Sequence, residues 1–312
     1  MGGWNNFFFK PISPSSIAIF RVVSGLVILI SLIGKYPYRE LFYGEKGIVS
    51  FHTLDPYFPG PPLMYFRWVP ASDPWLNFYF LAIMFFVIAL ILGFFTRLSS
   101  ILVFLGLISL NNRNFFVDNA GDHLMRINAF YLMFSQAGKA YSLDKWWKAR
   151  RGKETRELIP KSPWAQRMLQ LQLAYVYLDT VYLKIPGEGW QNGTALYYAL
   201  NYLELKRLDF KYLFYYLWQI KLATYGVLIA ETSMGTLIWF RKLRYWILAA
   251  GFLLHFGINL TMQFPVFQYV MMASLINFIY PEDMERFIGM LGGYFRHWLW
   301  HGHDQRQEVK TK

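Results

Sequence analysis

Three ionisable residues lie inside apolar stretches of the sequence, where a charge is expensive to hold. Lys184 ends the stretch YLDTVYLK, Glu231 lies in VLIAETSMG, and His255 lies in LLHFGINLT. An ionisable group at membrane depth is a functional-site hypothesis by default. A lysine partly removed from water gives up its proton more easily, because desolvation penalises its charged form, and it can then act as a general base. The sequence therefore predicts a catalytic group of Lys184, His255 and Glu231.

Each of these residues also has a structural interpretation. Lys184 could extend its ammonium group to the interface from a helix end. His255 could be a neutral core histidine bonded to a neighbouring carbonyl group. Glu231 needs a partner when it is buried, and Lys184, His255 or Lys221 could form a structural ion pair with it.

A second polar group surrounds the predicted start of a helix, in the sequence NNRNFFVDNAGDHLMR. Seven polar side chains lie within a dozen residues, which is more than helix capping alone requires. We expect Asn112, Arg113, Asn114, Asp122 and Arg126 to bind a substrate or cofactor. Capping by the Asn and Asp residues remains the alternative for this run, and Arg126, like Arg21, could instead be an interhelical anchor.

Composition excludes several classes of protein. The 312 residues are 55% hydrophobic and only 16% charged, with a mean hydropathy of +0.24, whereas soluble domains carry about 25% charged residues. This argues against a cytosolic enzyme and against a nucleic-acid-binding protein, despite the net charge of +12. The absence of cysteine excludes disulfides and thiolate chemistry. We expect no metal site, because the histidines of the tail (His297, His301 and His303) are more typical of a surface.

Hydropathy instead predicts an all-α, polytopic transmembrane helix bundle of about eight spans, since a span needs roughly 20 mostly apolar residues. Three of the stretches are short by this measure. The expected spans are Ser16–Lys35, Trp75–Phe95, Leu98–Leu110, Asp122–Ala137, Met168–Ile185, Leu213–Phe240, Trp246–Met262 and Val266–Ile279.

The distribution of Lys and Arg predicts the orientation of these spans. The densest basic stretch, Lys139–Pro163, belongs in the cytoplasm by the positive-inside rule. Both termini then lie inside, and the long connection Tyr36–Pro74 and an interfacial helix at Thr194–Leu205 lie outside. We expect one domain over residues 1–312, with its core at about 14–282 and a basic cytoplasmic tail at 283–312.

Four stretches, in order along the chain, resemble the HTTM family, the membrane domain shared with vitamin K-dependent gamma-carboxylase. They are FRVVSGLVIL with ELFYGEKGIVS, NNRNFFVDNAGDHLMRINAFYLMFSQAGKAYSLD, YLKIPGEGWQNGTALYYAL and HFGINLTMQFPVFQYVMMASLINFIY. The second and third are the most specific. The chain is similar to the stand-alone bacterial branch, which implies a bacterial inner membrane and an active site that faces outward.

The resemblance implies a mechanism and its participants. In the carboxylase, a lysine deprotonates reduced vitamin K, oxygen reacts with the quinol, and the strong base so formed prepares a glutamate side chain to capture carbon dioxide. Lys184 matches that lysine by its place before Trp190, and His255 matches a histidine of the fourth stretch. Reduced menaquinone or vitamin K, oxygen and carbon dioxide are the implied cofactors. A secreted or membrane peptide is the implied partner, beside the lipid bilayer.

One departure from the carboxylase pattern keeps other functions open. Arg113 or Asn114 stands where the carboxylase has a functional histidine. We therefore weigh a quinol-dependent membrane enzyme that modifies an exported peptide or a small substrate, in the manner of a carboxylase or lyase. The alternatives are a non-catalytic maturation or immunity factor for a secreted peptide and, third, a transporter with Lys184, Glu231 and His255 along its path.

Overall fold

The computed structural model describes residues 2–48, 72–152, 157–208, 216–264 and 266–291. Within these ranges the chain is helical, and its only β-structure is two isolated bridges, between Ile12 and Lys161 and between Lys206 and Met262. Most of the predicted outer connection 36–74 and most of the predicted tail 283–312 lie outside the described residues, as do His297, His301 and His303.

Eight main helices occupy the eight stretches that hydropathy selects. They are α2 (Ser15–Lys35), α6 (Asp73–Leu92), α7 (Thr96–Arg113), α8 (Ala120–Phe134), α10 (Trp164–Lys184), α13 (Leu217–Thr236), α14 (Arg244–Thr261) and α15 (Phe267–Leu275). Short helices lie before and between them: α1 (Gly2–Phe9), α3 (Arg39–Tyr43), α9 (Leu143–Arg150), α11 (Glu188–Gln191) and α12 (Ala195–Asn201). The predicted interfacial helix is α12, which ends four residues before the expected boundary.

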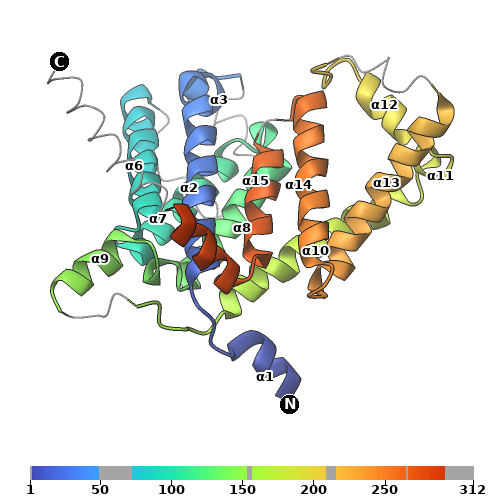
Figure 1. Ribbon diagram of the computed structural model, residues 1–312. Coiled ribbons are helices and arrows are strands. Elements are labelled where there is room, and N and C mark those ends of the chain that lie inside the picture. The colour runs from blue at the N-terminus through green and yellow to red at the C-terminus, as the bar shows by residue number, and fades with distance from the viewer. Residues whose placement is uncertain (1, 49–71, 153–156, 209–215, 265, 292–312) are drawn as a thin grey trace, which may run out of the picture.

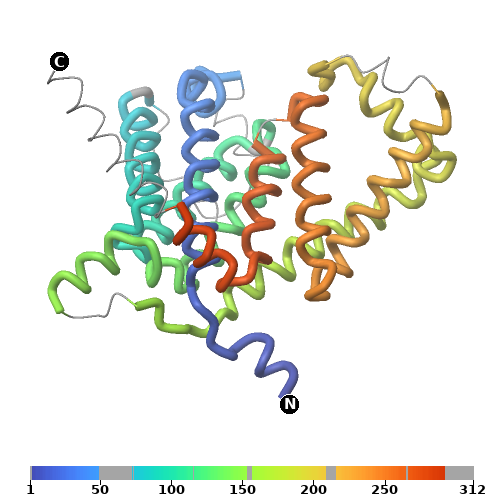
Figure 2. Tube along the Cα trace, in the orientation of Figure 1, coloured from blue at the N-terminus to red at the C-terminus, as the bar shows by residue number. Residues whose placement is uncertain are grey.

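The main helices alternate in direction along the chain (Figures 1 and 2). The connection through α9 and the turn between α13 and α14 lie at the end of the bundle where α1 also lies; we call this the basic end. The short helices α3, α11 and α12 lie at the opposite end. This alternation is what eight successive membrane spans would require.

The buried core is apolar and continuous across the bundle. Ile28 and Leu32 of α2, Phe80 and Leu90 of α6, and Leu110 of α7 are at most 2% exposed. Small residues allow the close approach of neighbouring helices, which favours packing where water supplies no driving force. Gly106 of α7, for example, leaves no room for a Cβ, which would lie 2.7 Å from Ile83.

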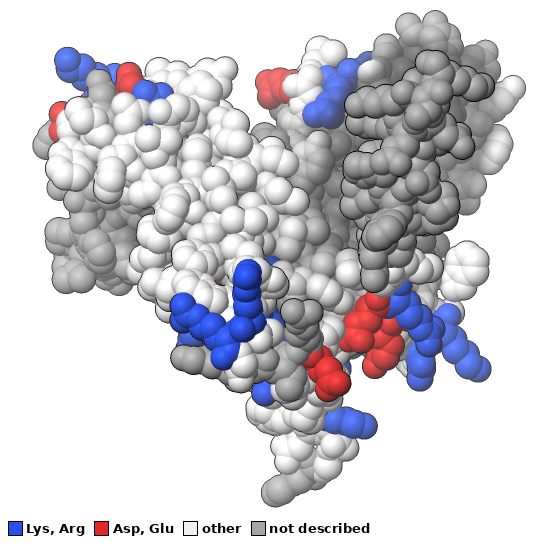
Figure 3. Space-filling model, turned by 60° about the vertical axis from the view of Figure 1, so that its left-hand side comes forward, with Lys and Arg blue, Asp and Glu red and all other residues white. Residues whose placement is uncertain are grey.

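The outer surface of the bundle is also apolar. On the face seen in Figure 3, charged side chains gather toward the upper and lower edges, with an uncharged band between them. Large apolar side chains project from several main helices, among them Ile30, Phe85, Leu222, Ile229 and Leu253. Two helical stretches, Ser15–Tyr43 and Pro74–Leu92, are long and apolar enough to cross a membrane. A surface of this kind suits a lipid environment better than water.

Candidate functional site

The close packing of α10 against α13 brings Lys184 and Glu231 together. These helices are antiparallel, with Leu178 beside Gly235 and Lys184 beside Glu231. At Gly235 a Cβ would lie 2.5 Å from Leu178 Cγ, so only glycine permits this separation of the helices. The glycine four residues after Glu231 therefore sets the distance between the two charged side chains.

Lys184 Nζ lies 2.5 Å and 2.6 Å from the two carboxylate oxygens of Glu231. The lysine side chain is 24% exposed, whereas that of Glu231 is only 9% exposed. Lys184 Nζ also lies 4.9 Å from the centre of the Trp190 ring, which α11 places over it. Of the three partners that the sequence left open for Glu231, the structure selects Lys184.

His255 lies in a separate group of buried side chains, which come from α10, α14 and α15. Its Nε2 is 2.7 Å from the Tyr177 hydroxyl, and its Nδ1 is 2.5 Å from Gln268 Oε1. Because an amide oxygen only accepts, the contact with Gln268 requires a proton on Nδ1, whereas the Tyr177 hydroxyl can donate to Nε2 or accept from it. Both ring nitrogens are thus occupied by protein groups, which fixes the orientation of the His255 ring.

The two groups are neighbours along α10. Tyr177 precedes Lys184 by seven residues, which places both side chains on one face of the helix, about 10 Å apart along its axis. Glu231 and Tyr177 interact electrostatically, as do Lys184 and His255. The structure therefore brings the three predicted catalytic residues into one region, with a direct contact only between Lys184 and Glu231.

The polar run at the end of α7 has mainly internal partners. Arg113 Nε donates to the carbonyl oxygen of Tyr43 at 2.8 Å, and Asn114 Nδ2 donates to that of Phe42 at 2.6 Å. Both side chains are buried and hold the end of α3 against the bundle. Asn112 is half-buried.

Asp122 and Arg126 of α8 are also explained by local structure. Asp122 forms a capping box with Asn119 and accepts from Lys35 Nζ at 2.5 Å. Arg126 contacts the exposed His123 at 2.9 Å. The first residues of α8 nevertheless approach the histidine group, since Gly121 packs against the backbone of Phe267, whose ring meets that of His255 edge-on.

Asp118, in the connection between α7 and α8, gives a pH-dependent prediction. Its pKa is raised above the ordinary value of 3.8, first because burial removes water from the carboxylate and then because Asp122 adds a like charge. A raised pKa means that the folded state binds the carboxyl proton more tightly than the unfolded state does. The bound proton therefore stabilises the fold fully below pH 3.8, and this stabilisation is lost as the pH rises through the folded-state pKa. We therefore expect Asp118→Asn to raise the thermal midpoint at pH 7 and to leave it nearly unchanged at pH 3.5.

The measurement is thermal unfolding of detergent-solubilised protein between pH 3.5 and pH 8. The exposed carboxylate Glu282 provides the control, because Glu282→Gln should shift the midpoint little at any pH. A lower midpoint for Asp118→Asn at pH 7 would show that the contact of Asp118 with His123, at 3.4 Å, outweighs the cost of burying its charge.

Two residues of this region were not among the sequence predictions. Tyr177 and Gln268 are 2% exposed and hold the two sides of His255. The sequence does contain a signal for each. Tyr177 has the seven-residue spacing to Lys184, and Gln268 is a lone amide in an otherwise apolar helix.

The site as a whole is suited to moving protons. A carboxylate and an amine in direct contact can exchange a proton, and the amine is the member that solvent or a bound molecule can reach. Among the residues that the structure describes, no three His, Asp or Glu side chains gather as metal ligands.

Comparison with known proteins places the chain in a family. Searches of curated proteins and of solved structures gave no match. The family model described as the HTTM domain matches residues 9–282, which include every residue of the site described above. The chain belongs to the HTTM domain family.

Proposed function

We propose that this protein is an integral membrane enzyme that deprotonates a hydrophobic quinol, with Lys184 and Glu231 acting together as the proton acceptor. The observation that carries the proposal is the buried ion pair at 2.5 Å and 2.6 Å, of which one member is open to a substrate. Carbon dioxide and oxygen are the proposed co-reactants, and the modified group belongs to an exported peptide or a small substrate.

The ion pair decides how the two residues share this role. An ammonium group held by a carboxylate has no free electron pair, so Lys184 becomes a base only after Glu231 takes its proton. Proton transfer within the pair leaves a neutral amine on the exposed side and a neutral carboxylic acid on the buried side. The low polarity of the surroundings favours this neutral state, because burial penalises both charges. In this proposal Glu231 is the buried proton store and Lys184 is the group that meets the quinol.

The surroundings of Lys184 suit an aromatic, lipid-soluble substrate. Trp190 offers a flat ring beside the ammonium group, and Tyr182 and Leu183 expose apolar surface at the same end of α10. Aromatic rings stack favourably on one another, and pockets for such ligands are mostly apolar with few polar groups. We place this site toward the outer leaflet of a bacterial inner membrane, because the basic end then faces the cytoplasm.

The experiment uses the full-length protein in nanodiscs with a reduced naphthoquinone, oxygen and bicarbonate. Removal of the hydroxyl proton makes the quinol easier for oxygen to oxidise, and mass spectrometry follows the product, in which one oxygen atom forms the epoxide and the other leaves as water. We expect epoxide above the level found with empty nanodiscs. Quinol that is consumed no faster than in empty nanodiscs would contradict the proposal and would favour the non-catalytic maturation or immunity factor.

A further inference from the structure

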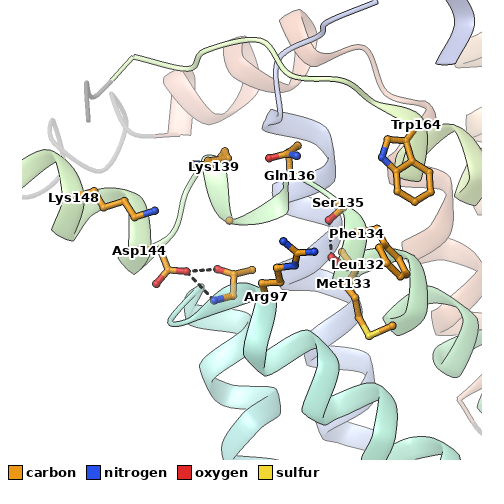
Figure 4. Close-up of a pocket in the computed structure, with 12 residues that line it drawn as sticks. Arg97, Leu132, Met133, Phe134, Ser135, Gln136, Lys139, Asp144, Lys148 and Trp164 are labelled. Carbon is orange, nitrogen blue, oxygen red and sulfur yellow. Dashed lines mark hydrogen bonds between the residues drawn. The ribbon is translucent and has the colours of Figure 1, made fainter. Parts of the chain in front are cut away.

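A second concave region lies at the basic end, away from the site around Lys184. It is a pocket of about 460 Å³ between the start of α7, the end of α8 and the segment that leads into α9 (Figure 4). Arg97, Lys139 and Lys148 line it together with Ser135, Gln136 and Trp164. Arg97 and Lys148 lie on exposed parts of the chain and form no hydrogen bond or ion pair among the described residues.

The one acidic residue of this pocket is already engaged. Asp144 accepts from the backbone N–H of Phe95 at 2.8 Å, and from the backbone N–H and the hydroxyl of Thr96, each at 2.7 Å. These donors belong to the first turn of α7, whose positive end offsets the carboxylate charge. The cations of the pocket therefore outnumber the acidic charge, and that charge is directed at the helix. This arrangement fits an anionic ligand.

An apolar wall continues directly from these cations. An adjoining pocket of about 690 Å³ shares Thr96, Arg97, Asp144 and Lys148 with the first. The other residues that line it are Phe95, Leu98, Ile101, Trp147 and Arg151. Leu98 and Trp147 are 52% and 41% exposed. The ligand that matches both pockets carries a negative group at one end and a long apolar portion at the other.

The position of the two pockets along the bundle identifies the same type of ligand. The apolar helix α6 ends at Leu92, and α7 begins at Thr96, so the cations lie where two apolar helices reach their ends. Trp147 and Trp164 flank the region, and tryptophan is enriched at the boundary between lipid and water. Basic pockets between helices on the cytoplasmic side are suited to anionic lipid head groups.

We infer that this region binds one anionic glycerophospholipid. Its phosphodiester contacts Arg97 and Lys148, and an acyl chain lies along Leu98 and Ile101 of α7. The site is separate from the proposed quinol site and does not depend on it. It would tie α7, α8 and α9 to the inner leaflet.

The test titrates detergent-solubilised, full-length protein with phosphatidylglycerol and measures the one-to-one complex by native mass spectrometry. Each removed cation should weaken binding roughly fivefold, so Arg97→Gln/Lys148→Gln should raise the Kd about 25-fold. The matched control is Lys10→Gln/Lys242→Gln, which removes two exposed charges elsewhere at the basic end and should leave the Kd unchanged.

Two further ligands test whether binding needs both the negative charge and the acyl chains of the lipid. Phosphatidylcholine keeps the phosphate and acyl chains but is neutral overall, and glycerol phosphate keeps the charge without the chains. We expect both to bind at least tenfold more weakly than phosphatidylglycerol. Equal binding of phosphatidylcholine, equal binding of glycerol phosphate, or an equal Kd for both double variants would each overturn the inference.

Discussion

Lys184→Ala is expected to abolish quinone epoxide formation, with a loss of at least 100-fold, because a positioned general base contributes 10²–10⁴-fold. The same change leaves the Glu231 carboxylate buried without its partner, 2.5 Å away in the native protein. Removing one member of a buried ion pair destabilises a fold by about 3–5 kcal/mol. Uptake of a proton by Glu231 lowers this cost. The measurement is epoxide yield per folded protein, with folding followed by circular dichroism and size-exclusion chromatography.

A double variant separates catalysis from stability at this pair. In Lys184→Met/Glu231→Gln no buried charge remains, so the thermal midpoint should return toward that of the native protein while epoxide formation stays at background. Lys221→Ala is the matched control, because Lys221 is an exposed lysine on the same helix as Glu231, and it should keep full activity. Native epoxide yield from the double variant would show that the pair is only structural.

Arg21→Met is expected to lower the stability of the fold by about 3–5 kcal/mol, because several carbonyl oxygens lose their donor. Arg21 is fully buried in α2 and donates to the carbonyl oxygens of Ala137, Tyr141 and Ile91, at 2.9 Å, 2.7 Å and 3.4 Å. Methionine fills much of the same space but removes the donor of three carbonyl oxygens, of which that of Ala137 is buried and the other two are partly buried. A buried acceptor without a donor costs about 1–3 kcal/mol.

Thermal unfolding in detergent measures this effect, and a second arginine calibrates it. Arg126→Met removes the same group from a position where its one side-chain hydrogen bond among the described residues is with the exposed His123. Its effect should stay within about 0.5 kcal/mol. Similar midpoints for Arg21→Met and the native protein would show that the helix packing around α2 holds without these hydrogen bonds. The sequence left open that Arg21 is an interhelical anchor, and its hydrogen bonds to other segments agree with that interpretation.

Hydropathy located a stretch for each of the eight main helices, although three of these stretches are short for a membrane span and were included because of the pattern around them. It was less accurate where polar residues continue a helix. The third helix runs to Arg113 rather than to Leu110, since Asn111, Asn112 and Arg113 remain helical. Side chains such as Arg113 find partners in a neighbouring segment that hydropathy does not consider.

The candidate site was likewise only partly predictable from the sequence. The sequence singled out Lys184, Glu231 and His255 because charge in an apolar stretch is visible in one dimension. It did not determine which of them meet, since Lys184 and Glu231 are 47 residues apart and depend on the contact at Gly235. Tyr177 and Gln268 acquire a role only through His255, whose two nitrogens they occupy.

Residue types and hydropathy thus predicted by themselves a helical, membrane-type protein with ionisable groups among its helices, and four sequence stretches carried its resemblance to the HTTM family. The tertiary structure alone decided their partners. It gave Asn114 and Arg113 to the carbonyl groups of α3 rather than to a pocket, and it formed the basic pocket from α7, α8 and the segment before α9. The physical reason is that hydropathy is a property of the local sequence, whereas a hydrogen bond or an ion pair requires two groups that only packing brings within about 3 Å.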